Sequence, residues 1–286
     1  MNGVLVIGGA NADIKAKTCA KHVAATSNPA EIHIKPGGVA RNIAHNLARL
    51  GIETDLITVL GNDANGAMIT KATEKAHVSM AHSIFVNAPT GTYVAVLDEN
   101  GELITAASDM KCLSFISKMQ IIQRHNLLRE KKYILADCNL DVEALAEIAS
   151  QAAEKLVIEP VSVSKCQKLK FLLQNHKIFL ATPNLDQLEA LADTRDIAVG
   201  IVKLHEYGLQ NLVVHAGAQG AYASDGKAIT HIPSQALAIV DVTGTGDAAT
   251  AGLIYGLMQN ATLANAAMIG QQLAAKVIAS PFSTLE

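Results

Sequence analysis

The sequence predicts an α/β protein with a doubly wound, mostly parallel sheet flanked by helices. Short apolar or β-branched runs recur along the chain, as is typical of parallel strands that are covered on both faces. Helical patterns separate these runs, as expected for the crossovers of a parallel sheet. The chain has 286 residues, 50% hydrophobic and 17% charged, enough for one large domain with a substantial core. We therefore expect a single domain over residues 1–286.

The elements follow in order along the chain. The helix expected at residues 40–50 places Ala40, Ile43 and Leu47 on one face, and Gly51 follows it where a C-terminal cap is expected. A further strand at residues 238–242 leads into a glycine-rich turn and then an apolar helix. The other predicted strands lie at residues 4–7, 56–60, 133–136, 156–158, 178–181 and 212–214.

Two segments, at about residues 15–36 and 84–107, interrupt this alternation. The first lacks helical periodicity, and the second contains Asn100-Gly101 between two extended runs, a strong hairpin signal. We expect both segments to form a small β-sheet that acts as a lid over the carboxyl edge of the main sheet, where ligands bind in open α/β folds. A solvated surface hairpin is the alternative interpretation.

The composition argues against several classes of protein. The formal net charge is −3, aromatic residues make up 3% of the chain and tryptophan is absent, which argues against a nucleic-acid-binding surface. Apolar runs fall short of the roughly 18 residues of a membrane span, and the N-terminus has no signal-peptide pattern. The four cysteines are scattered, which favours reduced thiols in a cytoplasmic protein.

The most informative stretch is the glycine-rich turn Asp241-Val242-Thr243-Gly244-Thr245-Gly246-Asp247. Small residues at the start of a helix let an anion approach the backbone N–H groups, and the helix dipole favours negative charge there. Asp247 adds a carboxylate to the same place. This combination suits a reaction in which a phosphate arrives and a hydroxyl loses its proton.

Two polar segments follow predicted strands in the N-terminal region. The first, at residues 8–13, lacks the G-x-G-x-x-G spacing of a dinucleotide-binding fold, which argues against a nicotinamide dehydrogenase. Its Asn11 and Asp13 are suited to hydrogen-bonding vicinal hydroxyls, or are ordinary turn residues. In the second, Gly37 and Gly38 allow a ligand to approach the backbone, and Asn42 either points at that ligand or serves the helix terminus.

Two later segments are candidates for a nucleotide site. Asn184, with Gln187 and Glu189 close behind it, is suited to order metal-bound water around a polyphosphate, or forms a plain acidic first helical turn. Gly217 and Gly220 follow a buried strand, which fits a nucleotide lying along the backbone or a simple turn.

Taken in order, these fragments resemble the ribokinase-like (PfkB) carbohydrate kinase family over essentially the whole chain. The family's Gly-Gly, N-x-x-E and D-T-x-G-A-G-D signatures correspond to Gly37-Gly38 with Asn42, to the Asn184 segment and to Asp241–Asp247. Within the family, the resemblance is greatest to its pseudouridine-phosphorylating branch. That similarity rests on residues 27–29, 36–44, 136–139 and 160–162 with Lys165-Cys166.

The resemblance implies ATP-dependent phosphorylation of the pseudouridine 5′-hydroxyl, with Mg²⁺, possible K⁺ dependence and a homodimer formed through the lid. Asp247 is then the general base, and the implied anion hole comprises Gly244, Thr245 and Gly246.

The resemblance also implies the residues of the binding sites. The sugar site would comprise Asn11, Asp13, Gly37, Gly38, Asn42 and Asn139, and the ATP site Asn184, Gly217, Gly220 and Thr243. Magnesium would lie near Gln187 and Glu189, and a monovalent cation would lie near Asp241 and Thr243.

The chain departs from the family pattern at three positions. Gln187 replaces the glutamate of N-x-x-E, so the usual support for the metal lacks its negative charge. Thr245 replaces the alanine of the C-terminal signature, and Glu159 stands where a strand-end aspartate is expected. The alternatives are therefore a kinase of another sugar or nucleoside, such as ribose, fructose or adenosine, and a weakly catalytic nucleoside sensor of the same fold.

Overall fold

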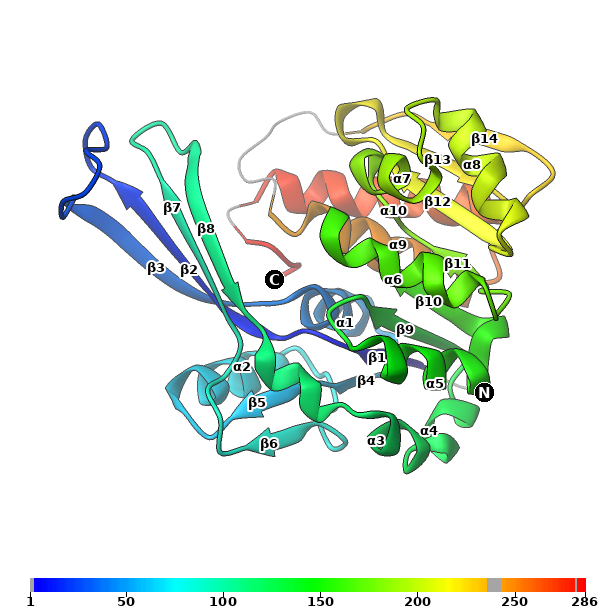
Figure 1. Cartoon of the computed structure of the whole chain (residues 1–286), viewed down its shortest axis with the longest axis horizontal. Coiled ribbons are helices and arrows are strands. Elements are labelled where there is room, and N and C mark those ends of the chain that lie inside the picture. The colour runs from blue at the N-terminus through cyan, green and yellow to red at the C-terminus, as the bar shows by residue number, and fades with distance from the viewer. Residues whose placement is uncertain (1–2, 236–242, 281) are drawn as a thin grey trace.

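The main sheet has eight strands among the residues described by the computed structural model, which are 3–235, 243–280 and 282–286. The strand pairs are parallel except those that β13 makes with β12 and β14. This confirms the predicted doubly wound, mostly parallel sheet (Figure 1). The order is β14 (Ile229–Ile232), β13 (Ala221–Ser224), β12 (Asn211–His215), β11 (Leu180–Ala181), β10 (Leu156–Glu159), β9 (Tyr133–Asp137), β1 (Val4–Ile7) and β4 (Thr54–Ile57).

Helices cover both faces of this sheet, and β1 shows why. Its residues alternate between faces, so Leu5 and Ile7 pack in one apolar core while Val4 and Val6 pack in the other. On the first face lie α3 (Lys118–Ile122), α4 (His125–Glu130), α5 (Val142–Ala152), α6 (Val163–Leu173), α7 (Leu185–Ala192) and α8 (Ile197–Glu206). On the second lie α1 (Val39–Arg49), α9 (Thr245–Met258) and α10 (Leu263–Ile278).

The prediction of a single strand at residues 56–60 is wrong, because these residues belong to two strands in different sheets. Its first part belongs to β4, whereas β5 (Val59–Gly61) pairs with β6 (Ile84–Val86) in a separate two-stranded sheet. The helix α2 (Ala64–Lys75) follows β5, and its N-cap Asp63 accepts a hydrogen bond from the Gly66 N–H.

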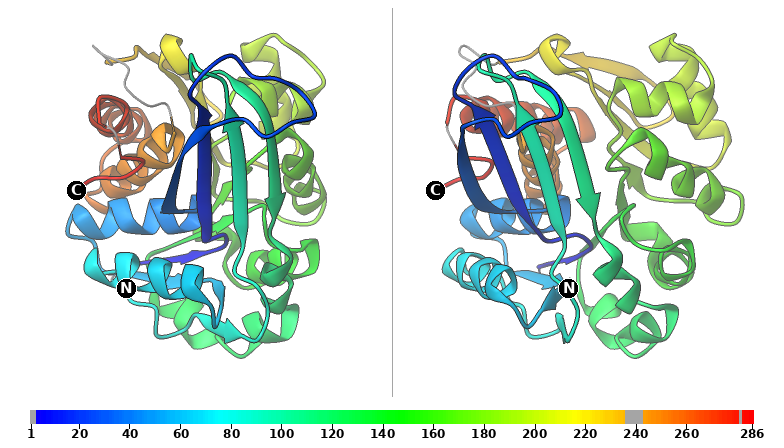
Figure 2. Two further views of the ribbon diagram at one scale, coloured as in Figure 1. Left: turned by 90° about the vertical axis from the view of Figure 1, so that its left-hand side faces the viewer. Right: turned by 60° about the vertical axis from the view of Figure 1, so that its left-hand side comes forward.

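A small four-stranded sheet projects from the main body, in the order β3 (Ala30–Gly37), β2 (Asn11–Thr18), β7 (Thr92–Leu97) and β8 (Leu103–Asp109). Figure 2 shows these strands side by side. The separate small sheet was predicted, but its boundaries differ. It begins at Asn11 rather than near residue 15, and residues 84–86 belong to β6 instead. The Asn100-Gly101 turn does join β7 to β8 as a hairpin.

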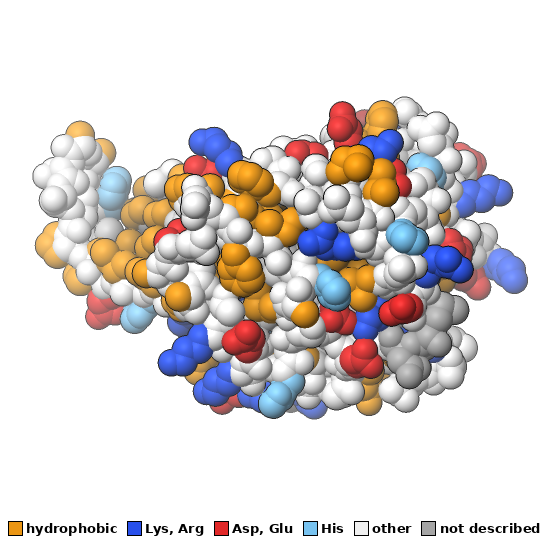
Figure 3. All heavy atoms as spheres, turned by 90° about the horizontal axis from the view of Figure 1, so that it is seen from below, with side chains coloured by type: hydrophobic (Ala, Val, Ile, Leu, Met, Phe, Trp, Pro, Cys, Tyr) orange, Lys and Arg blue, Asp and Glu red, His pale blue; other side chains and the backbone are white. Residues whose placement is uncertain are grey.

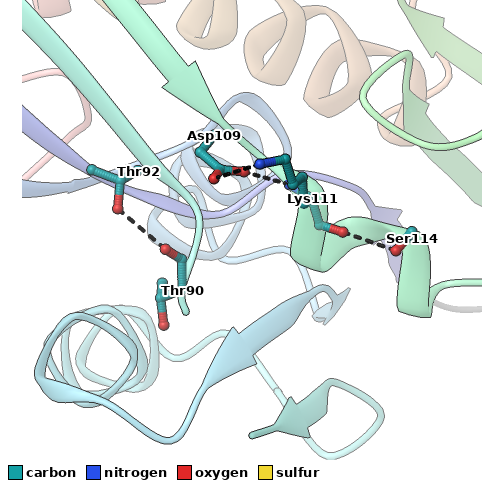
Figure 4. A network of polar contacts seen from close by, with 5 residues as sticks. All are labelled: Thr90, Thr92, Asp109, Lys111 and Ser114. Atoms are coloured by element: carbon teal, nitrogen blue, oxygen red, sulfur yellow. Dashed lines mark hydrogen bonds and ion pairs between the residues drawn. The ribbon is translucent and has the colours of Figure 1, made fainter. Parts of the chain in front are cut away.

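Short polar contacts fix the base of this sheet where the chain enters β7 and leaves β8 (Figure 4). The Thr92 hydroxyl donates to the Thr90 carbonyl over 3.1 Å. Across the pair, Asp109 accepts the Lys111 N–H over 3.1 Å, and the Ser114 hydroxyl donates to the Lys111 carbonyl. The contact between Asp109 and Lys111 links the end of β8 to the start of η1 (Lys111–Phe115).

The two faces of the small sheet differ in chemistry. Strand alternation and the pairing register place Asp13 and Lys15 on one face. The opposite face carries an apolar set, and hydrophobic side chains gather on this projecting part in Figure 3. The apolar set comprises Ile14, Ala16, Ile32, Ile34, Val94, Val96 and Leu103.

None of the helices within the described ranges has the length and apolar character needed to cross a membrane. The strand predicted at residues 238–242, with Asp241, lies outside the described residues.

Candidate active site

The glycine-rich turn opens α9 as predicted. Gly244 caps the helix with a φ of +77°, and a Cβ there would overlap the Ser283 carbonyl oxygen, so the position requires glycine. The first N–H groups of a helix lack intrahelical acceptors and carry the positive end of its dipole. A Cβ on Gly246 would meet no described atom within 4 Å, so the space beside the helix start is open.

Asp247 lies in the first turn of α9 and faces α1. The Asn42 amide nitrogen donates to Asp247 Oδ2 over 2.8 Å, which joins residues 205 positions apart. Burial raises the pKa of Asp247 to about 7, the Asn42 hydrogen bond opposes this, and the charges of Asp137 and Asp13 add to it. A carboxylate with a pKa near neutrality is well matched to general-base catalysis.

The paired glycines bring α1 to this place. Gly38 has a φ of +102°, and a Cβ on it would lie 2.5 Å from the Gly9 carbonyl oxygen. A Cβ on Gly37 would overlap the Asp13 carboxylate. Gly38 is therefore limited to glycine by the close approach of the backbone after β1, whereas a side chain at position 37 would have to displace the Asp13 carboxylate of β2.

Asn11 and Asp13 lie together at the start of β2. The Asn11 amide donates to Asp13 Oδ1 over 2.6 Å. Burial raises the pKa of Asp13, while this hydrogen bond and the charges of Lys15 and Arg41 lower it. The pair therefore offers one buried amide and one carboxylate at the edge of the site, as hydrogen-bonding sugar hydroxyls would require.

The fully buried carboxylate of Asp137 organises the carboxyl end of β9. It accepts N–H groups from Gly9 over 2.8 Å, from Ala40 over 3.2 Å and from Asn139 over 2.9 Å. Lys165 of α6 donates to Asn139 Oδ1 over 2.5 Å. Asn139 was predicted as a site residue and Asp137 was not, although its place as an aspartate at a strand end was the available signal.

Asn184 and Gln187 form a reciprocal capping box at the start of α7. Each side-chain oxygen accepts the other residue's backbone N–H over 2.9 Å. Glu189 pairs with Arg195, with 2.9 Å between Oε1 and Nε. With these contacts, the Gln187 and Glu189 side chains are not arranged to ligate magnesium directly. Within the described ranges, no group of three His, Cys, Asp or Glu side chains is arranged to hold a metal ion.

Gly217 and Gly220 shape the connection between β12 and β13. Both have positive φ, of +56° and +90°. A Cβ on Gly220 would overlap the Ile232 carbonyl oxygen, whereas one on Gly217 would meet nothing described within 4 Å. A backbone bridge between Asn184 and His215 brings this connection beside the start of α7, so the predicted nucleotide residues are neighbours.

A second contact joins the small sheet to the glycine-rich turn. The Lys15 ammonium donates to the Thr243 hydroxyl over 2.7 Å. Lys15 was not predicted as a site residue, because its partner Thr243 lies 228 positions away in the sequence.

A buried polar group behind Asp247 was also missed. Glu159 accepts the Thr182 hydroxyl over 2.7 Å and the Thr250 hydroxyl over 3.4 Å, and Thr250 lies one turn after Asp247. Burial raises the pKa of Glu159 to about 8, and the charges of Asp247 and Asp137 add to that rise. Thr250 also contacts His215 Nε2 at 3.3 Å, and burial lowers the pKa of that histidine to about 4.

The raised pKa of Glu159 predicts that stability falls as the pH rises from about 6.5 to 8. In this window the unfolded chain has already released the proton that folded Glu159 retains, so the free energy of unfolding decreases. The lowered pKa values of His45 and His215 act oppositely, but only below about 6.5, the ordinary histidine value. The raised pKa of Asp247 adds to the decrease only up to about pH 7, so the decrease between about pH 7 and 8 is assigned to Glu159.

Urea unfolding across this pH window measures the effect. Glu159→Gln is expected to flatten the decrease, whereas Asp141→Asn, at the exposed N-cap of α5, is expected to leave it unchanged. An equally steep decrease in Glu159→Gln would contradict the assignment.

Residues 1–284 match the pfkB family of carbohydrate kinases. The chain belongs to this family. As a pfkB kinase it is a phosphotransferase that acts on a sugar or nucleoside hydroxyl, with ATP as co-substrate.

Known proteins resemble this pfkB kinase in sequence and in fold. Pseudouridine kinase of Escherichia coli strain K12 is 36% identical over 259 residues, which cover 87% of this chain and 82% of that protein. Guanosine-inosine kinase of Exiguobacterium acetylicum is 27% identical, over 98% of this chain and 95% of that protein. The structure of Arabidopsis thaliana ribokinase complexed with ribose and ATP shares the fold, with a TM-score of 0.86, 20% identity and coverage of 100% and 96%.

Proposed function

We propose that this kinase transfers the γ-phosphoryl group of ATP to the 5′-hydroxyl of pseudouridine. The observation that carries the proposal is the Asp247 carboxylate at the open start of α9, held by Asn42 and with a pKa near neutrality. The 36% identity to a pseudouridine kinase supports the choice of substrate.

In this mechanism the protein mainly positions the reactants and stabilises charge. The hydroxyl donates to Asp247, which takes its proton as the oxygen attacks the γ-phosphorus and the bond to the β-phosphate oxygen breaks. The N–H groups at residues 244–247 stabilise the charge on the transferred group. Asn11, Asp13, Gly38 and Asn139 hold the ribose, with Asn42 beside Asp247.

Magnesium is expected to arrive on the phosphates of ATP with bound waters, as is usual for this ion. It would neutralise phosphate charge there, and we assign it no protein ligand because Gln187 and Glu189 are engaged with Asn184 and Arg195. The monovalent-cation site at Asp241 and Thr243 stays a prediction, since Asp241 lies outside the described residues.

A substrate comparison tests the proposal. Purified enzyme is incubated with Mg·ATP and pseudouridine, uridine, adenosine, guanosine, ribose or fructose, and ADP release is measured. We expect the highest kcat/KM with pseudouridine. A higher kcat/KM with guanosine or adenosine would favour a purine nucleoside kinase. The similarity to guanosine-inosine kinase supports this alternative. Tight nucleoside binding without ADP release would favour a sensor.

We further propose that the small sheet is both a lid and a dimer interface. Its polar face, with Asp13 and Lys15, lies toward the site, and closing it over the substrate would exclude water. On the opposite face, Ile32 and Ile34 are 63% and 52% exposed, and a contiguous exposed apolar surface favours association.

Sedimentation analysis is expected to give a dimer for the parent and a monomer for Ile34→Asp. Ile229→Asp, at an exposed isoleucine of β14, is the matched control and is expected to remain dimeric. A monomeric parent would contradict this interface.

A further inference from the structure

Arg41 is a buried cation directly beside the site. It lies on α1 between Ala40 and Asn42, and only 2% of its surface is exposed. Burial lowers the pKa of its guanidinium to about 10, which reflects the cost of removing this charge from water. Such a group is tolerated in the interior only when its donors are hydrogen-bonded, so its partners indicate what it does.

The guanidinium contacts acceptors in three directions. Nη1 donates to Asn42 Oδ1 over 3.2 Å and to the Pro36 carbonyl over 3.4 Å. Nε donates to the Thr73 hydroxyl over 3.4 Å, and Nη2 lies 3.0 Å from His45 Nδ1. The planar fork thus joins the end of β3, two positions of α1 and a residue of α2.

The contact with Asn42 determines how that amide is turned. Arginine has donors only, so the Asn42 atom facing it must be the oxygen. The amide nitrogen then faces Asp247 Oδ2, where it lies at 2.8 Å. In the reverse orientation, two donors would meet at Arg41 and two oxygens would meet at Asp247.

The contact with His45 holds the Arg41 guanidinium at its Nη2 atom. Nδ1 must accept from Arg41, so Nε2 carries the hydrogen and donates to the Leu285 carbonyl over 2.8 Å. The Leu285 N–H donates to Asn46 Oδ1 over 2.8 Å. The C-terminal segment, whose Ser283 lies against Gly244, is thereby held on the helix that carries Asn42.

We propose that Arg41 is a positioning residue that holds the Asn42 amide in the orientation that donates to Asp247. The inference rests on the proposed role of Asp247 as general base. Asn42 stabilises the carboxylate form of Asp247, so a freely rotating amide would raise the pKa of the base. Among the residues that the structure describes, the charges of Asp137 and Asp13 also raise the pKa of Asp247, and Asp247 in turn raises that of Glu159.

A double-mutant cycle between Arg41 and Asn42 tests the proposal. Arg41→Lys keeps the positive charge but replaces the fork by one donor position, so its effect does not come from charge loss. We expect it to lower kcat at pH 7 by about 10-fold, the scale of one hydrogen bond to a charged group. In the Asn42→Ala background the same change is expected to cost less than about 2-fold.

The matched control is Arg49→Met, an exposed arginine two turns further along α1, which is expected to leave kcat unchanged. The KM for ATP is expected to stay constant in Arg41→Lys, because Arg41 acts on the acceptor side. Equal losses of kcat in both backgrounds would overturn the proposal, since Arg41 would then act independently of Asn42.

A carboxyl NMR titration gives a readout that does not depend on kinase activity. The Asp247 signal is assigned by its loss in Asp247→Asn, and its apparent pKa is measured in the parent, Arg41→Lys, Asn42→Ala and the double variant. We expect a rise in each single variant and no further rise in the double. An unchanged pKa in Arg41→Lys would overturn the inference, whereas an active Asp247→Asn would overturn the proposed function alone.

Discussion

Asp247→Asn is expected to lower kcat by about 10²–10⁴, the usual range for loss of a general base. The amide has nearly the same shape, and its oxygen can still accept the hydrogen bond from Asn42. It cannot take the proton of the acceptor hydroxyl. Thermal unfolding is therefore expected to change little while turnover collapses. Asp141→Asn, at the exposed N-cap of α5, is the matched control and should retain parental turnover.

The pH dependence of kcat provides a second signature of the same residue. The pKa of Asp247 is raised to about 7, so the reactive carboxylate is lost as the pH falls through that value. We expect kcat of the parent to rise with pH through about 7, and this limb to be absent from the residual activity of Asp247→Asn. A parental limb near pH 4, the ordinary range of aspartate, would contradict the assigned environment.

Gly246→Ala is expected to lower kcat by about 10²-fold without destabilising the protein. A Cβ at this position meets no described atom within 4 Å, and alanine is favoured over glycine in a helix. The new methyl group would instead occupy the space in which the transferred phosphoryl group contacts the backbone. The expected loss matches that of one donor to an anion hole.

Gly244→Ala separates this ligand effect from a structural one. Its φ of +77° and the overlap of a Cβ with Ser283 predict lower thermal stability together with lower activity. Parallel measurements of kcat and the thermal midpoint distinguish the two variants. Full activity in a stable Gly246→Ala would contradict the proposed anion hole.

The sequence predicted the main fold because buried strands and glycine-rich turns are local patterns. The start of α1 after Gly37-Gly38 and the start of α9 after Gly244 depend on few neighbouring residues, and both lie where expected. The division of residues 56–60 between two sheets was not predictable, because β5 is defined by pairing with β6, more than 20 residues away.

The supporting residues of the site were missed for the same reason. Asp137 joins segments 128 and 97 positions away, and Glu159 is linked to Thr250 across 91 positions. Neither residue belongs to a short sequence motif from which its hydrogen-bond partners could be predicted. Gln187 illustrates the opposite case, since its departure from the family pattern was visible in the sequence, but its reciprocal cap with Asn184 emerged only from the structure.

The most direct measurement is phosphorus NMR of the reaction of parent and Asp247→Asn enzymes with Mg·ATP and pseudouridine. We expect the parent to form pseudouridine 5′-phosphate and ADP in equal amounts, and Asp247→Asn to form both about 10²–10⁴ times more slowly. Equal rates in the two enzymes, or no phosphorylated nucleoside from the parent, would contradict the proposed function.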